Sequence, residues 1–258
     1  MFGRSRLIPT LCALAILLAP TGTTTSQPRS EPPRFSPVAP GIAHASFKAG
    51  PTDAGPFSGH AFRIDLEVAD LRLIPAGDPP LRRSVEQIVE PYPAVVASNA
   101  SFFDKDGRAM GLVVDAGRVI GSSNRRAWGA LVIDGNQARI TLGADIADPA
   151  GHRLIVQGLP RLLVGGQVQP LKPQIAERTA VCAGGNIVIL VVSTSADTTT
   201  FARFLADPPE QGGLGCRDAL NLDGGPSSQL AVRLPGLTLS VPGGWGVPNA
   251  LIVVPGKQ

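Results

Sequence analysis

The stretch "TAVCAGGNIVILVV", residues 179–192, decides the class of fold. Two apolar runs lie on either side of a Gly-Gly-Asn turn, and the second run, residues 187–192, is rich in β-branched side chains. Such side chains favour strands, and glycine supplies the backbone conformations that a tight turn needs. The stretch therefore predicts an antiparallel hairpin, with residues 187–192 as its most buried strand.

The same pattern recurs on the N-terminal side of this hairpin. Paired apolar runs around glycine turns occupy residues 112–120, 130–140 and 162–169. Asp134-Gly135 in the second pair predicts a type I′ turn, which needs positive φ at both central residues. Further strands are expected at 60–68, which alternates polar and apolar residues, and at 94–99, a short apolar run that predicts burial on both faces.

Two short helices complete the pattern. Residues 84–90 begin with Ser84 as N-cap and Gln87 three residues later, a capping box, and residues 199–207 end before Pro208. The apolar face of the second helix is formed by Phe201, Phe204 and Leu205. The whole pattern predicts an α+β fold: β-rich mixed sheets with antiparallel hairpins and a few short helices.

The first 40 residues predict export. Residues 1–26 have a basic start, an apolar core at 7–19 that is too short to cross a bilayer, and a small polar end, which is the layout of a secretory signal peptide. Residues 27–40 are Pro-rich and polar and predict an extended spacer with nothing to pack. Residues 41–258 then form one domain. We expect a secreted or periplasmic protein that is not inserted in a membrane once the signal peptide is removed.

Charge and cysteine content indicate which partners to expect and whether a disulfide forms. The net charge is +3, and the tight basic pairs 82–83 and 125–126 have no interleaved aromatic residues. A nucleic-acid groove needs a basic stripe, so nucleic acid is not an expected partner. Once the signal peptide is removed, Cys182 and Cys216 remain. An even pair in an oxidising compartment predicts a disulfide, the alternative being two free buried thiols.

Three clusters carry candidate chemistry, and the first is "SNASFFDKDGRAMG", residues 98–111. It begins where a buried strand ends, a usual position for binding residues, and it offers the amide of Asn99 beside the aromatic ring of Phe103. Asp104 and Asp106 resemble part of a calcium loop that lacks further ligand positions. A solvated turn is the favoured interpretation of these two acids, with a metal site as the alternative.

The second cluster is "ERTAV", residues 177–181, at the start of an apolar strand. Its Arg178 is either a fork that holds an anion or one partner of a surface Glu–Arg pair.

The third cluster is "NLDGGPSSQL", residues 221–230, in which Asp223 ends a short buried strand. Gly224 and Gly225 let a ligand approach the backbone closely, and Ser227 and Ser228 present hydroxyl groups. A plain turn explains the glycines but does not explain an acid on the core side of the turn.

Other kinds of site are less well supported. The three histidines lack metal-ligand spacing, and a Ser227–His152–Asp223 triad has only the presence of these residues in its favour.

The three clusters, in this order and with "LPRLLVGGQVQP" (159–170) between them, resemble the phosphodiester glycosidase family from about residue 60 to the C-terminus. The resemblance implies an exported, carbohydrate-active hydrolase that cleaves sugar 1-phosphodiesters. Trp245 and Gly246 stand where family members commonly carry an arginine. The resemblance implies catalytic roles for Asn99, Arg178 and Asp223, and substrate contacts from Phe103, Thr179, Gly224, Gly225, Ser227, Ser228 and Asn249.

A sugar phosphodiester suits a site with one carboxylate, because its leaving group is already an acidic phosphate. We expect Asp223 to act as base or nucleophile at the sugar, Arg178 to hold the phosphate, and Asn99 to position the sugar. No cofactor is expected, although a divalent cation stays open. Two other functions compete: a non-catalytic polysaccharide-binding or exopolysaccharide assembly factor, and a metal-dependent phosphodiesterase that uses Asp104, Asp106 and Asp223.

Overall fold

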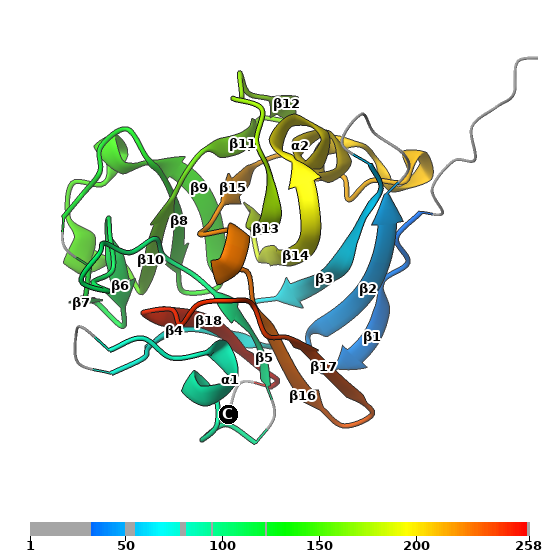
Figure 1. Ribbon diagram of the computed structural model, residues 1–258. Helices are drawn as coiled ribbons and strands as arrows, with labels where there is room; N and C mark the ends of the chain where they lie inside the picture. Colours follow the sequence, from blue (N-terminus) through cyan, green and yellow to red (C-terminus); the bar gives the residue numbers. More distant parts are fainter. Residues whose placement is uncertain (1–31, 50–54, 78–80, 94, 122, 257–258) are drawn as a thin grey trace, which may run out of the picture.

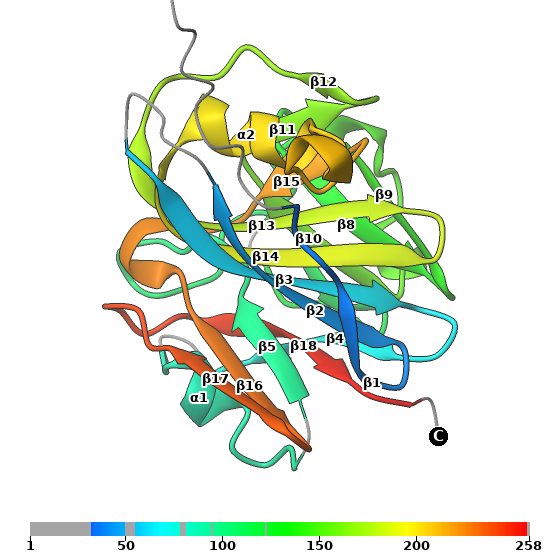
Figure 2. The same ribbon diagram turned by 90° about the vertical axis from the view of Figure 1, so that its right-hand side faces the viewer.

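The computed structural model describes residues 32–49, 55–77, 81–93, 95–121 and 123–256. The expected signal peptide, residues 1–26, lies outside them. The chain folds into three β-sheets with a few short helices on their outer faces (Figures 1 and 2). Every pairing between the described strands is antiparallel. The prediction of a β-rich fold with hairpins and few helices is confirmed, but the sheets are antiparallel rather than mixed.

The described strands form one sheet of eight strands and two sheets of five. The eight-stranded sheet has the order β1 (Ser36–Ala39), β2 (Ile42–Ala49), β3 (Phe57–Asp65), β14 (Ile187–Asp197), β13 (Ile175–Gly184), β15 (Ala219–Asn221), β11 (Arg161–Val164) and β12 (Gln167–Val168). A second sheet has the order β7 (Arg118–Val119), β6 (Val113–Asp115), β10 (Leu154–Gly158), β8 (Gly129–Asp134) and β9 (Gln137–Leu142). A third has the order β17 (Leu237–Val241), β16 (Leu230–Leu234), β5 (Val95–Asn99), β18 (Asn249–Val254) and β4 (Asp70–Pro75). The helices are α1 (Val85–Ile88) and α2 (Thr198–Ala206), with 3₁₀ turns η1 (Gly143–Asp145), η2 (Pro149–Gly151), η3 (Pro209–Gln211) and η4 (Gly225–Ser227).

The main hydrophobic core lies where the three sheets meet. Each sheet contributes one face to it: Val181 and Leu190 come from the first sheet, Leu131 from the second, and Val96 and Leu251 from the third. Helix α2 covers the opposite face of the eight-stranded sheet, and α1 covers the outer face of the third sheet. The side chains of β13 therefore alternate between the three-sheet core and the α2 side.

The central hairpin confirms the pattern from which the fold was predicted. Strands β13 and β14 pair from Gly184–Ile187 outward, across the Gly185–Asn186 turn. The expected disulfide is also present, because Cys182 of β13 bonds to Cys216 with their Cα atoms 5.9 Å apart. Both expected helices form. Ser84 and Gln87 make the predicted capping box, and α2 buries its apolar face.

Three local predictions are wrong. Residues 36–39 belong to strand β1, paired with β2, and are not part of an unpacked spacer. The β8–β9 turn has positive φ only at Gly135, which fits a type II′ turn rather than type I′. Residues 187–192 are not the most buried strand, because β5 is buried at all five positions whereas Ile187 and Ile189 of β14 are only half-buried.

Among the described helices, none is long and apolar enough to cross a membrane.

Candidate functional site

The turn from Asp223 to Ser228 lies between the sheets, with η4 near the centre of the face seen in Figure 1. It begins where the short buried strand β15 ends, as the sequence predicted. Gly225 adopts a φ of +58°, a conformation that other residues disfavour. At Gly224 the close neighbour is protein backbone, because a Cβ there would lie 2.9 Å from the Glu177 carbonyl oxygen. Both glycines are therefore needed by the path of the chain.

The Asp223 carboxyl group is the chemically distinctive group of this turn. Burial raises its pKa from 3.8 to about 6, although the Ser227 hydroxyl and the Gly224 N–H donate to it and favour the charged form. The Gly224 N–H lies 3.0 Å from the Asp223 Oδ1. A carboxyl group with a pKa near 6 changes its protonation state close to neutral pH, so it is able to accept and release a proton there.

Asn99 holds this turn in place through three hydrogen bonds. The side chain is fully buried at the end of β5. Its Nδ2 donates to the Asp223 carbonyl oxygen at 2.7 Å, and its Oδ1 accepts from the Thr179 hydroxyl at 2.8 Å and the Gln229 N–H at 3.0 Å. Asn99 and Thr179 therefore link β5, β13 and the 223–229 segment. Both act on the site through the position of Asp223.

Asn249 holds the neighbouring loop, which contains Ser101, in a similar way. Its Oδ1 accepts from the Ser101 N–H at 3.0 Å, and its Nδ2 donates to the Ser101 hydroxyl at 2.8 Å. The same loop presents the half-buried ring of Phe103. The Arg82 guanidinium lies over this ring, 5.2 Å from its centroid. The predicted residues Asn249 and Phe103 are thus brought to the same side of the molecule as Asp223, whose N–H donates to the Ala100 carbonyl oxygen at 3.2 Å.

The guanidinium of Arg178 is bonded to a different part of the molecule, around the start of α2. Its buried guanidinium donates to the Ala196 carbonyl at 3.2 Å, to the Thr198 hydroxyl at 2.7 Å and to the Gln174 carbonyl. These acceptors lie around the start of α2, on the face of β13 opposite the side chain of Thr179. Burial lowers the pKa of Arg178, and nearby Asp197 counteracts this effect. The structure does not bring this guanidinium together with the other predicted site residues.

The acidic loop after Phe103 is built as a turn. Asp104 Oδ1 accepts from the N–H groups of Asp106 and Arg108, each at 2.9 Å, and Asp106 forms an exposed ion pair with Arg108. Within the described residues, no three His, Cys, Asp or Glu side chains are grouped to hold a metal ion. His152 lies 2.9 Å from Asp134, so the structure does not assemble the triad with Ser227 and Asp223.

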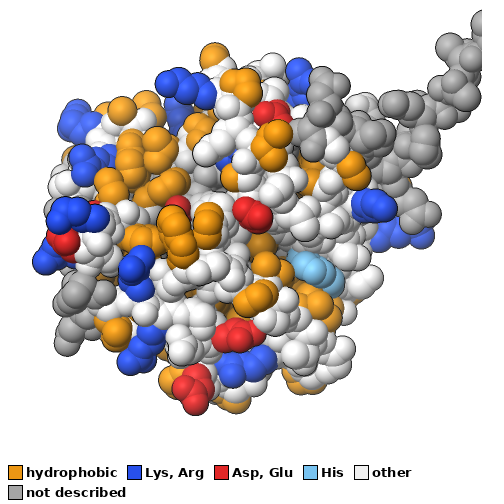
Figure 3. Space-filling view, viewed as in Figure 1, with side chains coloured by type: hydrophobic (Ala, Val, Ile, Leu, Met, Phe, Trp, Pro, Cys, Tyr) orange, Lys and Arg blue, Asp and Glu red, His pale blue; other side chains and the backbone are white. Residues whose placement is uncertain are grey.

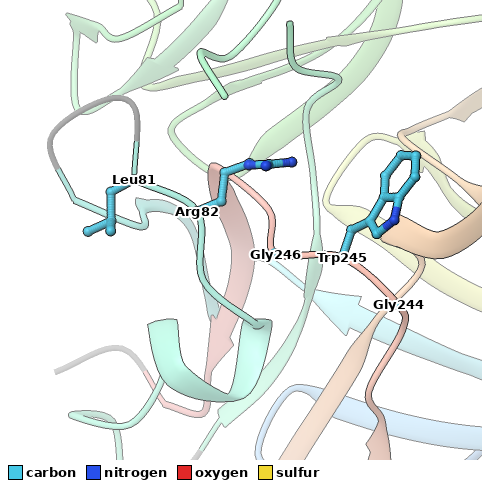
Figure 4. A pocket seen from close by; sticks show the side chains of 5 residues that line it. All are labelled: Leu81, Arg82, Gly244, Trp245 and Gly246. Carbon is cyan, nitrogen blue, oxygen red and sulfur yellow. The ribbon is translucent and has the colours of Figure 1, made fainter. Parts of the chain in front are cut away.

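Two hollows flank the 223–228 turn. A groove of about 700 Å³ is lined by apolar and polar residues, and the polar ones include His60, Glu177, Ser193 and Ser228. Ser228 Oγ is buried, and it has no hydrogen-bond partner among the described residues. A second hollow, of about 680 Å³, is lined by Leu81, Arg82, Gly244, Trp245 and Gly246 (Figure 4). The Gly244 and Trp245 N–H groups both donate to the Pro226 carbonyl oxygen, which places this hollow directly beside the turn.

Gln229 and Arg82 were not predicted from the sequence, and Trp245 was noted only as standing where family members commonly carry an arginine. The buried Gln229 side chain accepts from the Val85 N–H at 2.8 Å and donates to the Trp245 carbonyl oxygen at 2.7 Å. A polar residue in the apolar run after Ser228 was the available signal for Gln229. No sequence signal places Arg82 beside Trp245, because backbone bonds between Arg83 and Val247 bring their segments together.

The site therefore consists of one half-buried carboxyl group on a glycine turn that is held by buried amides and lies beside two hollows. A family model for phosphodiester glycosidases matches residues 92–254. The chain belongs to the phosphodiester glycosidase family, a family of hydrolases. A search of curated proteins finds no match.

Solved structures share the fold. The catalytic domain of zebrafish N-acetylglucosamine-1-phosphodiester alpha-N-acetylglucosaminidase, auto-inhibited by its pro-peptide, is 19% identical, with a TM-score of 0.64 over 93% of this chain and 91% of that chain. A hypothetical protein from Synechocystis is 18% identical, with a TM-score of 0.58 over 83% of this chain and 62% of that chain. A Burkholderia pseudomallei K96243 protein described as exported is 16% identical, with a TM-score of 0.60 over 81% of this chain and 76% of that chain.

Proposed function

We propose that this protein is an exported hydrolase that cleaves glycosyl phosphodiester linkages in glycans or glycoconjugates. The observation that carries the proposal is the half-buried Asp223 carboxyl group, with a pKa raised to about 6, on a turn that lies beside two hollows. Family membership supports the class of reaction. The zebrafish protein that shares the fold is named for a sugar 1-phosphodiester, and we extend that substrate class to this chain.

The reaction needs little acid assistance. Water adds to the anomeric carbon, the bond from that carbon to the phosphate oxygen breaks, and the phosphate monoester leaves as an anion. Asp223 serves this reaction in one of two ways. As a base it accepts a proton from the attacking water, and as a nucleophile it forms a glycosyl ester that water then hydrolyses. A single carboxylate suffices in both cases, because the leaving group is far more acidic than an alcohol.

The other predicted residues divide into two groups in this proposal. Asn99, Thr179 and Asn249 position the catalytic turn and its neighbouring loop, since their polar side-chain atoms bond to protein. Ser228 and Phe103 contact the sugar. The free hydroxyl of Ser228 suits a sugar hydroxyl in the groove, and the ring of Phe103 suits the apolar face of a sugar ring.

The remaining residues of the turn act close to Asp223. Ser227 and Gly224 donate to its carboxylate and stabilise the charged form, while Gly225 sets the turn conformation. A phosphate contact from Arg178 stays a prediction, to be tested by substitution.

Export is part of the proposal. It rests on the signal-peptide pattern of residues 1–26, on the Cys182–Cys216 disulfide, and on the fold shared with a protein described as exported. Disulfides persist in oxidising compartments outside the cytosol. We therefore propose a secreted or periplasmic location, with a carbohydrate phosphodiester as the partner.

The test is turnover of a panel of hexose and N-acetylhexosamine 1-phosphodiesters, with free sugar and phosphate monoester detected by mass spectrometry. We expect product from the wild type and none from a folded Asp223→Asn variant. Near-normal rates in that variant would overturn the role of Asp223. Saturable glycan binding without product would favour the polysaccharide-binding or assembly factor. Loss of activity on adding a chelator would favour the metal-dependent phosphodiesterase.

A further inference from the structure

The hollow beside the Asp223 turn presents a cation and an aromatic ring to solvent. Arg82 makes no hydrogen bond or ion pair with any residue that the structure describes, and only the ring of Phe103 supports it. Trp245 is 57% exposed, which is unusual for so large an apolar side chain. In Figure 4 these two side chains lie on opposite sides of the hollow, with the guanidinium directed towards the Trp245 side and Leu81 pointing away.

The backbone holds both side chains in place. Arg83 and Val247 exchange two backbone hydrogen bonds, and a Cβ at Gly246 would lie 3.1 Å from the Arg82 carbonyl carbon, so a larger residue there would require the two segments to shift by a few tenths of an ångström. The backbone of Trp245 is fixed at both polar groups, since its N–H donates to Pro226 and its carbonyl accepts from Gln229. An exposed pair on such a rigid frame has the properties of a binding surface.

A glycosyl phosphodiester substrate presents an anion that needs a cationic partner. Arg178 does not suit this role in the described structure, because its Nε and Nη2 already donate to protein acceptors around α2. The Arg82 guanidinium donates to no residue that the structure describes, and a fork of this kind pairs two donors with two phosphate oxygens. The position of Arg82 beside the turn that carries Asp223 suits a phosphate attached to the sugar on which Asp223 acts.

We propose that Arg82 and Trp245 form the subsite for the phosphate and for the group esterified to it. Arg82 pairs with the phosphate oxygens, and the indole of Trp245 packs against the ring of the esterified group. The groove that Ser228 lines, together with the ring of Phe103, is then left for the sugar. This assignment rests on the function proposed above, and it adds the orientation of the substrate across the site.

The experiment measures binding and turnover separately. Dissociation constants are determined by calorimetry in the Asp223→Asn background for glucose, galactose, mannose and N-acetylglucosamine 1-phosphodiesters, each with a methyl and a phenyl ester group. Arg82→Gln should weaken both esters by about 10- to 100-fold, because hydrogen bonds from a charged donor are lost. Arg83→Gln is the matched control, since only backbone atoms of Arg83 bond to the protein, and it should leave affinity unchanged.

Trp245→Ala tests the second half of the subsite. It should weaken the phenyl ester by several-fold and the methyl ester much less, because an aromatic stacking contact is lost. The matched control is Ile175→Ala, another exposed large apolar residue, which begins β13 and is not among the residues that line the hollow. Equal losses for the two esters would overturn the role assigned to Trp245.

The outcomes separate this inference from the proposed function. If the wild type binds these diesters through Arg82 but releases no sugar, the proposed hydrolase activity is refuted and the proposed subsite is supported. Normal affinity in Arg82→Gln, with turnover intact in the wild type, would keep the hydrolase and overturn the subsite. Equal losses in the Arg82 and Arg83 variants, or no binding of any diester to the parent protein, would also overturn the subsite.

Discussion

Replacing Asp223 by Asn should stabilise the fold at neutral pH while abolishing turnover. Burial raises the pKa of the Asp223 carboxyl group from 3.8 to about 6, so the folded protein must hold a charged group in a poorly solvated place. At about 1.4 kcal/mol per pH unit, this difference corresponds to a cost of up to about 3 kcal/mol when the group is ionised. Asparagine keeps an acceptor oxygen for the Gly224 N–H and carries no charge.

The sign of the effect defines its pH window. Below about pH 4 both the folded and the unfolded states of the wild type are protonated, and Asp223 adds no pH dependence. Between about pH 4 and pH 6 the unfolded chain releases its proton first while the folded protein keeps it, so the stability of the wild type falls as pH rises. The free energy of unfolding of Asp223→Asn should therefore exceed that of the wild type by an amount that grows across this window and stays constant above it.

Urea unfolding at a series of pH values measures this difference directly. Asp148→Asn is the matched control, because this exposed carboxylate accepts no hydrogen bond from any described residue and its loss should not open the same gap. A folded Asp223→Asn variant that is no more stable than the wild type at pH 7, with an unchanged urea dependence, would refute the reasoning. The ionisation also governs turnover, so the wild-type rate should rise with pH through about pH 6.

Three further outcomes are expected. Asn99→Ala leaves the partners of three hydrogen bonds unpaired, two of them buried, so it should lower the free energy of unfolding by about 3 kcal/mol in urea and lower kcat; wild-type stability would contradict this. Replacing Cys182 and Cys216 together by Ser opens a loop of 34 residues and should cost about 4 kcal/mol on the chain-entropy estimate, visible as a lower Tm than that of the oxidised wild type. Arg178→Gln should lower the Tm without raising the KM for phosphodiesters, whereas a raised KM in a stable variant would restore its predicted phosphate contact.

Local chemistry explains why much of the fold was predictable. The Gly-Gly-Asn turn, the capping box at Ser84 and the apolar run of β5 are each specified by neighbouring residues, and each forms as expected. The pairing of Ser36–Ala39 with β2 depends on tertiary contacts instead. A Pro-rich stretch has no local signal for a strand, so its place at the sheet edge follows only from the neighbour it meets.

The face of β13 from which the Arg178 side chain emerges could not be predicted from neighbouring residues, for a different reason. The β13–β14 pairing contains an irregularity between Ala176 and Arg178. In a strand, a shift of one residue moves a side chain to the opposite face. Sequence correctly placed Arg178 near the start of an apolar strand, but the face on which the guanidinium emerges depends on the register of the partner strand. Its acceptors at Ala196 and Thr198 belong to segments that no motif connects to it.

The site shows how a fold divides positioning from contact. Asn99, Thr179 and Asn249 are fully buried, and their polar atoms are bonded to protein, so changes there act by loosening the Asp223 turn and should lower stability and kcat together. Arg82 and Trp245 are exposed, and the partner of the Arg82 guanidinium among the described residues is the Phe103 ring, so changes there should alter affinity with little effect on stability. Motifs of small and polar residues find the first group because buried geometry restricts which residues fit. The second group is proposed to contact the ligand, and no local sequence pattern marks it, so only the folded chain reveals it.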